Sequence, residues 1–315
     1  MKKKANIFVA GHNGLVGSSV LRQLKLNGFE NLITVDKKRL DLRDFNKVKF
    51  FFKNIKIDYM VMAAARAGGI LANNNNQKDF FLENIEIQNS LLQLAFHKKI
   101  KRTIFLGTSC IYPKLSKTPI TEENLLSGKL EKTNQCYAIA KIAGIKFSEA
   151  LYEDHKIDIV CLMPTNVYGK NDHFDKVNGH VIPAMITKLI DAKKNKKKKV
   201  KLLGTGKPLR EFIHSDDLAE AIHFCLNISG LKLKKIFKSK LPILNVGTKD
   251  EIPIKSLSKL IAKYIRYEGK IEFDKVSPDG TFRKGLNSKK LNNLGWFPKI
   301  TLKKGLKDVI ESRLT

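Results

Sequence analysis

Hydrophobic residues along this chain alternate between short continuous runs and longer stretches with helical spacing. Each short run predicts a buried strand, and each stretch with apolar residues three or four apart predicts a helix. Because the strands are apolar throughout, they predict an α/β fold with a Rossmann-type, doubly wound parallel sheet. The strands are predicted at 5–10, 32–35, 58–62, 103–107 and 157–163, and the helices at 14–26, 45–55, 79–97 and 134–153.

The pattern becomes less regular after Pro164, which predicts a smaller C-terminal α/β region. A first domain is expected over 1–168, with returning segments at about 210–248, and a second region over 169–209 and 249–315. The lysine-rich run at 193–201 predicts a solvated turn or helix end. The expected elements are helices at 181–192, 216–228 and 253–266, strands at 241–246 and 271–273, a turn at 278–280 and a final helix.

The charge balance is strongly basic, with 59 Lys and Arg residues against 30 Asp and Glu residues, a net charge of +29. One interpretation is a protein that binds nucleic acid or an acidic membrane. Only 9 of these cations are Arg, however, and the lysines are scattered over most predicted helices. Because base edges and phosphates favour Arg, a lysine-rich surface without a nucleic-acid partner is the favoured interpretation. A few cations remain available for an anionic small substrate.

Neither the apolar content nor the cysteines indicate a membrane or secreted protein. No apolar run approaches the ~20 residues of a spanning helix, and the apolar segment before Gly11 is too short for a signal peptide. The four cysteines include no C-x-x-C pair, so a reduced, cytoplasmic protein without a metal site is expected. They are Cys110, Cys136, Cys161 and Cys225.

Three glycines directly after the first predicted strand have the spacing G-x-x-G-x-x-G and open the first helix. Gly11 permits the tight turn, Gly14 lets a pyrophosphate approach the backbone, and Gly17 lets helix and strand pack closely. The N–H groups of the helix N-terminus would then face the phosphates. This context predicts a dinucleotide site formed by Gly11, His12, Asn13, Gly14, Leu15, Val16 and Gly17.

The residues after the second strand leave the choice of dinucleotide open. Asp36 suits the ribose hydroxyls of NAD, whereas Lys37 and its neighbours Lys38 and Arg39 would accept the additional phosphate of NADP. Asp41 follows where the adenine edge would lie, and Asp44 is expected to cap the next helix. Both NADPH and NADH therefore remain possible at this point.

Tyr137 and Lys141 are four residues apart, which places them on one face of the predicted helix 134–153. An ammonium beside a phenol favours the phenolate, so a lowered pKa for Tyr137 is expected. Such a group exchanges a proton with a carbonyl or an alcohol. Thr108 follows another strand, at the edge where ligands bind in these sheets. The alternative is two ordinary surface residues, because this spacing also occurs by chance.

These motifs resemble the extended short-chain dehydrogenase/reductase family. Within it, the chain is most similar to the epimerase–reductases that act on GDP-4-keto-6-deoxy-D-mannose. The resemblance runs nearly end to end and rests on GHNGLVG, AAARAGGILAN, LGTSCIYPK, TNQCYAIAKIAGIK, MPTNVYG, NGHVIPAM, REFIHSDD, NVGT and PDGTFRK.

The resemblance implies a role for each of five residues. Tyr137 would donate the proton to the carbon-4 oxygen, with Thr108 and Lys141 completing the reductive group. Cys110 and His180 would be the base and the acid of epimerisation at carbons 3 and 5. From the residues alone, Cys110 reads as a small buried hydrophobe and His180 as a structural histidine.

The resemblance also implies the ligands and their contacts. NADPH would be the cofactor, with NADH not excluded, bound by the glycine loop and by Asp36, Lys37, Asp41, Leu42, Lys141, Pro164, Thr165, Asn166, Val167 and His180. A GDP-4-keto-6-deoxy-mannose-type nucleotide sugar would contact Asn166, Lys188, Leu203, Arg210 and Asp279. The first domain would therefore bind the dinucleotide and the second region the nucleotide sugar, in a homodimer formed through helices 79–97 and 134–153.

Three positions depart from the pattern of these relatives. Thr108 replaces the usual Ser and keeps the hydroxyl. Leu203 stands where a Trp can flank the nucleotide, and Asp36 with Lys37 differs from the usual Arg-bearing loop. A related 4-keto nucleotide sugar, a dideoxy or heptose sugar, is the alternative substrate.

Overall fold

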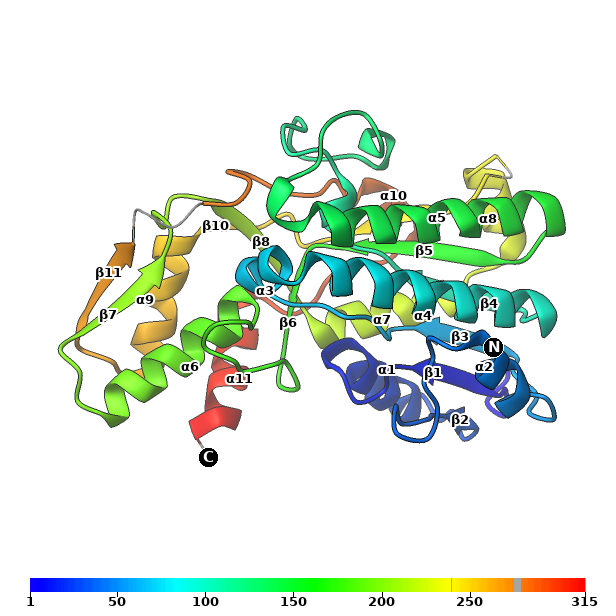
Figure 1. Cartoon of the computed structure of the whole chain (residues 1–315), viewed down its shortest axis with the longest axis horizontal. Coiled ribbons are helices and arrows are strands. Elements are labelled where there is room, and N and C mark those ends of the chain that lie inside the picture. Colours follow the sequence, from blue (N-terminus) through cyan, green and yellow to red (C-terminus); the bar gives the residue numbers. More distant parts are fainter. Residues whose placement is uncertain (239, 275–278, 315) are drawn as a thin grey trace.

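Six parallel strands form the central sheet of the computed structural model (Figure 1), which confirms the predicted doubly wound fold. The structure describes residues 1–238, 240–274 and 279–314, so Pro278 of the predicted turn lies outside the described residues. The strand order is β2-β1-β3-β4-β5-β9. From β1 the chain first adds β2 on one side and then β3 on the other, so the order in which strands are added reverses between β1 and β3. The strands are β1 (Ile7–Ala10), β2 (Leu32–Ile33), β3 (Tyr59–Met62), β4 (Arg102–Leu106), β5 (Ile159–Pro164) and β9 (Ile243–Val246).

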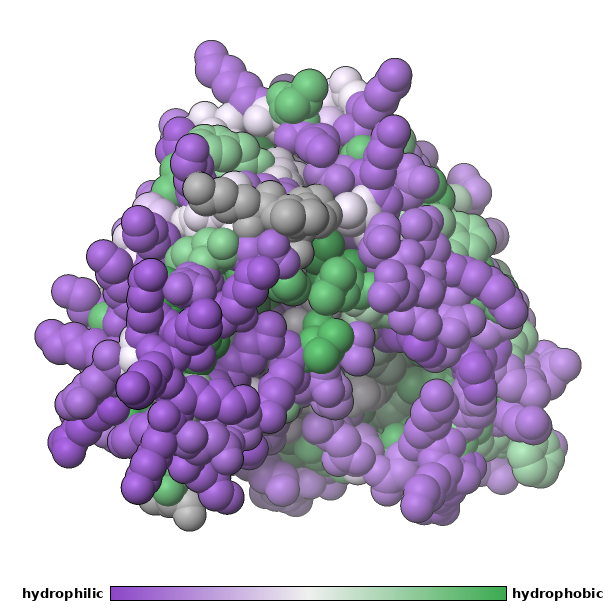
Figure 2. All heavy atoms as spheres, turned by 60° about the vertical axis from the view of Figure 1, so that its left-hand side comes forward, coloured by the Kyte–Doolittle hydropathy of each residue, from purple (hydrophilic) through white to green (hydrophobic). Residues whose placement is uncertain are grey.

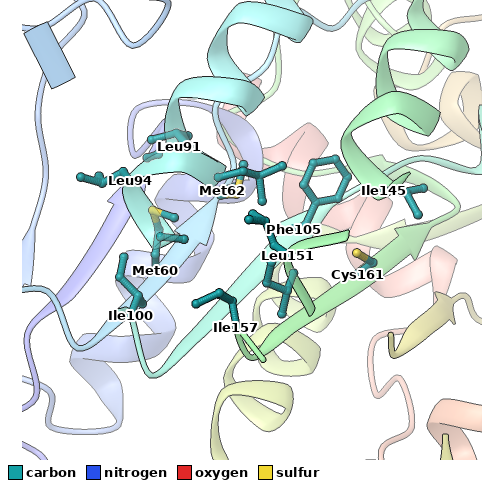
Figure 3. Packing of buried hydrophobic residues seen from close by; sticks show 14 of the residues in the cluster. Met60, Met62, Leu91, Leu94, Ile100, Phe105, Ile145, Leu151, Ile157 and Cys161 are labelled. Carbon is teal, nitrogen blue, oxygen red and sulfur yellow. The ribbon is translucent and has the colours of Figure 1, made fainter. Parts of the chain in front are cut away.

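The strands are mainly apolar because both faces of the sheet are buried. In β1, Phe8 and Ala10 point into one hydrophobic cluster, while Ile7 and Val9 point into another on the opposite face. Side chains alternate between the faces with a period of two, so a strand buried on both faces shows few polar positions. Figure 3 shows the first cluster, in which Phe105 of β4 packs among aliphatic side chains of the neighbouring helices.

Helices cover both faces of the sheet, as the alternation of strands and helices predicts. The face seen in Figure 3 carries α2 (Phe45–Phe51), α4 (Gln77–His97) and α5 (Gln135–His155). The opposite face carries α1 (Leu15–Leu26), α7 (Ser215–Asn227), α8 (Gly230–Ile236) and α10 (Lys289–Leu294). A short helix, α3 (Ile70–Asn75), lies between β3 and α4. Three short 3₁₀-helices lie between β4 and α5: η1 (Ser109–Ile111), η2 (Glu122–Asn124) and η3 (Lys132–Asn134).

The C-terminal region packs beside the sheet around a third hydrophobic cluster (Figure 1). Its three-stranded sheet has the order β10-β8-β6, and a separate parallel pair joins β7 to β11. Trp296, near the end of the chain, returns to the cluster on the opposite face of the main sheet. The elements are β6 (Asn166–Tyr168), α6 (Val181–Lys194), β7 (Lys199–Leu203), β8 (Leu209–His214), β10 (Glu251–Pro253), α9 (Ile254–Ile265), β11 (Lys270–Asp274) and α11 (Leu302–Leu314).

The lysine-rich run at 193–201 differs in part from its prediction. Lys193 and Lys194 end α6 as expected, but Lys199 begins β7. Within β7 the exposed Lys199 and Lys201 alternate with the buried Val200 and Leu202, so one face of the strand is solvated while the other packs on the third cluster. Figure 2 shows hydrophilic side chains over most of this side of the molecule.

Candidate functional site

A cavity of about 740 Å³ lies between the carboxyl ends of the parallel strands and the C-terminal region. The ends of β3, β4 and β5 contribute Met62, Leu106 and Pro164, and the C-terminal region contributes Lys188 and Arg210. This is the edge at which doubly wound sheets bind ligands, close to the reversal of strand order.

Two of the three glycines in the loop, Gly11 and Gly17, leave no room for a side chain. A Cβ on Gly17 would lie 2.1 Å from the carbonyl oxygen of Gly11, and a Cβ on Gly11 would lie 2.5 Å from the amide of Ala64. Gly14 is the N-cap of α1 and provides no side-chain cap, so the first N–H groups of the helix stay open to a ligand. The loop therefore fits a dinucleotide pyrophosphate, and Asn13, Gly14, Leu15 and Val16 line the cavity.

The predicted ribose and adenine contacts lie outside the lining of the cavity. Asn13 donates a hydrogen bond of 2.6 Å to the carboxylate of Asp36, and His12 lies 3.4 Å from the same oxygen. Lys37 is exposed beside them, and Leu42 packs against the first cluster.

Asp41 and Asp44 are each engaged within this segment. Arg43 lies 2.6 Å from Asp41 and holds the pKa of that carboxyl down at about 2. Asp44 caps α2 by accepting from the amide of Lys47, as the sequence predicts.

Thr108, Tyr137 and Lys141 all line the cavity. Thr108 stands at the end of β4 and caps η1 by accepting from the amide of Cys110. Tyr137 lies in the first turn of α5, and Lys141 lies one turn later. Lys141 is 4% exposed, and its ammonium donates a 3.0 Å hydrogen bond to the carbonyl of Leu106.

The protonation of these groups differs from the sequence expectation. Burial raises the pKa of the Tyr137 phenol, the charge of Cys110 raises it further, and a hydrogen bond with Thr108 opposes the change. Burial also lowers the pKa of Lys141 to about 8. The expectation of a lowered phenol pKa is wrong in this structure because desolvation outweighs the hydrogen bond. A phenol that keeps its proton is a proton donor rather than a base.

Cys110 is half-buried and has two polar neighbours around its sulfur. Asn134 donates to Sγ from 3.3 Å, and the ammonium of Lys284 lies 3.5 Å from Sγ. The carboxylate of Glu131 brings a negative charge near these residues. It forms a 2.9 Å ion pair with Lys114 and interacts electrostatically with Lys284. A hydrogen-bond donor and a cation therefore both lie at this sulfur, on the side of the cavity's lining residues.

His180 reaches the same cavity from the N-cap of α6. Its Nδ1 lies 3.3 Å from the carboxylate of Asp172, whose side chain is 4% exposed. The His180 side chain is 40% exposed, so part of its ring remains open to a ligand.

Lys188 and Arg210 bring two cations to the cavity, and within the described part of the chain neither forms an ion pair. Burial lowers the pKa of both groups, which reflects the cost of holding charge away from water. An anionic ligand would offset this cost. Asp279 also lines the cavity and accepts a 2.8 Å hydrogen bond from the amide of Thr205, and Leu203 is 46% exposed at the lining.

The cavity lining thus includes residues predicted for catalysis, for cofactor binding and for substrate binding. The predicted residues in its lining are Asn13, Gly14, Leu15, Val16, Thr108, Cys110, Tyr137, Lys141, Pro164, Thr165, Asn166, Val167, His180, Lys188, Leu203, Arg210 and Asp279. Those outside it are Gly11, His12, Gly17, Asp36, Lys37, Asp41 and Leu42. Lys284, Asn134 and Asp172 were missed by sequence reasoning. Lys284 lies within PDGTFRK and Asn134 within TNQCY, but no local pattern marks Asp172.

Residues 7–237 match the sequence profile of the NAD dependent epimerase/dehydratase family. GDP-L-fucose synthase 1 of Arabidopsis thaliana is 45% identical over 305 residues, covering 96% of this chain and 91% of that protein. GDP-L-fucose synthase of Escherichia coli K12 is 41% identical over 303 residues, covering 96% and 94%.

A solved structure of a GDP-D-glycero-L-gluco-heptose synthase from Campylobacter jejuni, in the presence of NADPH, has a TM-score of 0.91. It is 32% identical and covers 100% of both chains. None of the helices that the structure describes is both long and apolar enough to cross a membrane.

Proposed function

This chain belongs to the NAD dependent epimerase/dehydratase family, and on that premise we propose that it converts GDP-4-keto-6-deoxy-D-mannose to GDP-L-fucose. It is an NADP-dependent enzyme that epimerises carbons 3 and 5 and then reduces carbon 4. The observation that carries the proposal is that Cys110, His180 and Tyr137, from three distant segments, line one cavity.

Epimerisation needs a base and an acid on the two faces of the sugar. The 4-keto group acidifies the hydrogens on carbons 3 and 5, so a base of moderate strength removes them. Cys110 is that base, supported by the donor Asn134 and the cation Lys284 at its sulfur. His180 returns a proton to the other face, and the hydroxyls of Thr108 and Tyr137 stabilise the enolate oxygen.

Reduction uses the same polarised ketone. A bound NADPH supplies the hydride that reduces carbon 4. Tyr137 gives its proton to the carbon-4 oxygen, and its raised pKa keeps that proton on the phenol until the oxygen becomes basic. The ammonium of Lys141, one turn along α5, then stabilises the phenolate that remains.

Two of the cations in the cavity lining account for the nucleotide part of the substrate. Lys188 and Arg210 are half-buried without an ion-pair partner in the described residues, and a diphosphate supplies the missing charge. Asn166 and Asp279 offer further polar contacts. The glycine loop and these two cations come from different parts of the chain, which supports a division into a dinucleotide-binding domain and a sugar-binding region.

The test is incubation with the 4-keto substrate and NADPH in deuterium oxide. We expect GDP-fucose as the product, with deuterium at carbons 3 and 5. A folded protein that gives neither product nor deuterium exchange would falsify the proposal. A substrate panel that includes GDP-4-keto-heptoses decides the alternative that the C. jejuni structure suggests, because the preferred substrate has the highest kcat/KM.

A homodimer is the second part of the proposal. The adjacent helices α4 and α5 expose Phe81, Leu82 and Ile139, which are between 38% and 45% exposed. Exposed apolar groups on this pair of helices support burial against a second copy. Sedimentation should give the mass of a dimer, and Phe81→Glu should give that of a monomer.

The four free thiols agree with a reduced, cytoplasmic location.

A further inference from the structure

Two histidines of this chain are each the N-cap of a helix, but their rings form different hydrogen bonds. His214 is the N-cap of α7, and its Nδ1 accepts a 3.2 Å hydrogen bond from the amide of Asp216. That ring therefore serves the helix end. His180 is the N-cap of α6 but makes no such bond. Its ring is free of any capping function, and its Nδ1 faces Asp172 instead.

The contact with Asp172 determines which nitrogen of His180 carries the proton. An ionised carboxylate only accepts hydrogen bonds, so Nδ1 of His180 must carry the hydrogen that it donates to Asp172. In the neutral ring Nε2 is then the unprotonated nitrogen and the one that takes up a proton. The hydrogen bond to one ring nitrogen thus selects the chemistry of the other.

Asp172 is held rigidly enough to act in this way. Its side chain is 4% exposed, and Oδ1 also accepts from the amide of His173 at 2.8 Å. The preceding residue, Asn171, donates a 2.9 Å hydrogen bond to Ser18 of α1, which ties the loop to the helix of the glycine motif. A Cβ on Gly179 would lie 2.5 Å from the carbonyl of Asp175, so the loop closes tightly before His180.

The charge of Asp172 has few other partners. Its second oxygen, Oδ2, is buried without a hydrogen bond within the described residues. Among the residues that the structure describes, His180 is the one ionisable side chain that pairs with this carboxylate. Burying a carboxylate in this way costs free energy unless a neighbour offsets the loss of water by a hydrogen bond or an opposite charge. The neighbour is the ring that lines the cavity.

We propose that Asp172 is a positioning residue that fixes the orientation and tautomer of His180, so that Nε2 is the nitrogen that exchanges protons in the cavity. This inference rests on the proposed function, in which His180 is the acid of epimerisation. Asp172 also lines the cavity, but its side chain is 4% exposed, and in this role it acts through the imidazole.

The test combines a spectroscopic signature with kinetics on the full-length protein. Long-range ¹H–¹⁵N spectra of [¹⁵N]histidine-labelled protein report the tautomer of each ring, and His180→Gln identifies the signals of His180 among the seven histidines. We expect hydrogen on Nδ1 in the unaltered protein and a shift of hydrogen to Nε2 in Asp172→Ala. The isosteric Asp172→Asn preserves the packing and should also lose the fixed tautomer.

The kinetic arm follows deuterium entry at carbons 3 and 5 of the substrate. We expect kcat for exchange to fall about ten- to hundredfold in Asp172→Asn, the usual cost of losing an outer hydrogen bond to a functional histidine. KM should stay within about twofold, because the Asp172 side chain is almost completely buried and acts through His180. Asp216→Asn is the matched control, since Asp216 lies 3.7 Å from Nδ1 of His214, and it should leave the His180 signals unchanged.

Unchanged tautomer signals in both Asp172 variants, or exchange within twofold of the unaltered protein, would overturn the proposal. The two proposals fail separately. If the unaltered protein exchanges no hydrogen of any GDP-4-keto sugar, the proposed function is wrong, while the spectra still decide whether Asp172 sets the tautomer of His180.

Discussion

Replacement of Lys141 by Met tests the burial of its ammonium through the pH dependence of folding stability. The folded-state pKa is about 8 against an ordinary value of 10.5, because the group is 4% exposed and has one hydrogen bond, to the carbonyl of Leu106. The proton is therefore bound more weakly in the folded protein than in the unfolded one. Methionine has a similar length and no charge, so Lys141→Met removes this difference.

The sign follows from the number of protons bound by each state. Between about pH 8 and about pH 10.5 the unfolded chain keeps the proton that the folded chain has lost, so stability rises with pH. The difference of 2.5 between the two pKa values corresponds to about 3 kcal/mol. About 2 kcal/mol of this falls between roughly pH 7 and pH 9.5. Below pH 7 the group is charged in both states and the term is constant.

Guanidinium unfolding of both proteins, without cofactor, measures the difference in the free energy of unfolding across this range. The unaltered protein should gain about 2 kcal/mol relative to Lys141→Met between roughly pH 7 and pH 9.5. Lys146→Met is the control, because Lys146 is an exposed lysine of the same helix, and its difference should stay constant. A constant difference for Lys141→Met as well would refute the argument that desolvation controls this ammonium.

Four further predictions concern the chemistry and the ligands. Tyr137→Phe should reduce NADPH oxidation more than deuterium exchange, and Cys110→Ser should reduce deuterium exchange more than NADPH oxidation. The opposite ranking in paired assays would contradict the roles of the two residues. Gly17→Ala places a Cβ 2.1 Å from a backbone oxygen, so NADPH titration should show binding weakened by at least about tenfold or the protein should unfold. Asp36→Ala removes a carboxylate near Lys37 and should raise the kcat/KM ratio of NADPH over NADH by roughly tenfold. Arg210→Gln should raise the substrate KM by about tenfold or more, and an unchanged KM would exclude a diphosphate contact.

Local patterns predicted the main sheet because each strand and helix reports its own burial. The runs around β1, β3, β4, β5 and β9 are apolar because both faces of the sheet are covered. β8 was not predicted, since it carries Arg210, Glu211 and His214 in place of an apolar run. Glu211 is fully buried there because the amides of Lys249 and Leu286, from distant segments, bond to its carboxylate. A sequence window cannot contain such partners.

The site divides in the same way between what the sequence indicates and what the fold decides. The glycine loop, the Asp44 cap and the Tyr137–Lys141 spacing are local, because turn sterics and helix geometry act over a few residues. The sequence determined these features and, through its motifs, the family. The ammonium of Lys284 meets the sulfur of Cys110 across 174 residues, and burial reverses the expected shift of the Tyr137 pKa. Only the tertiary structure decides such properties, because desolvation and charge depend on which distant groups the fold brings into contact.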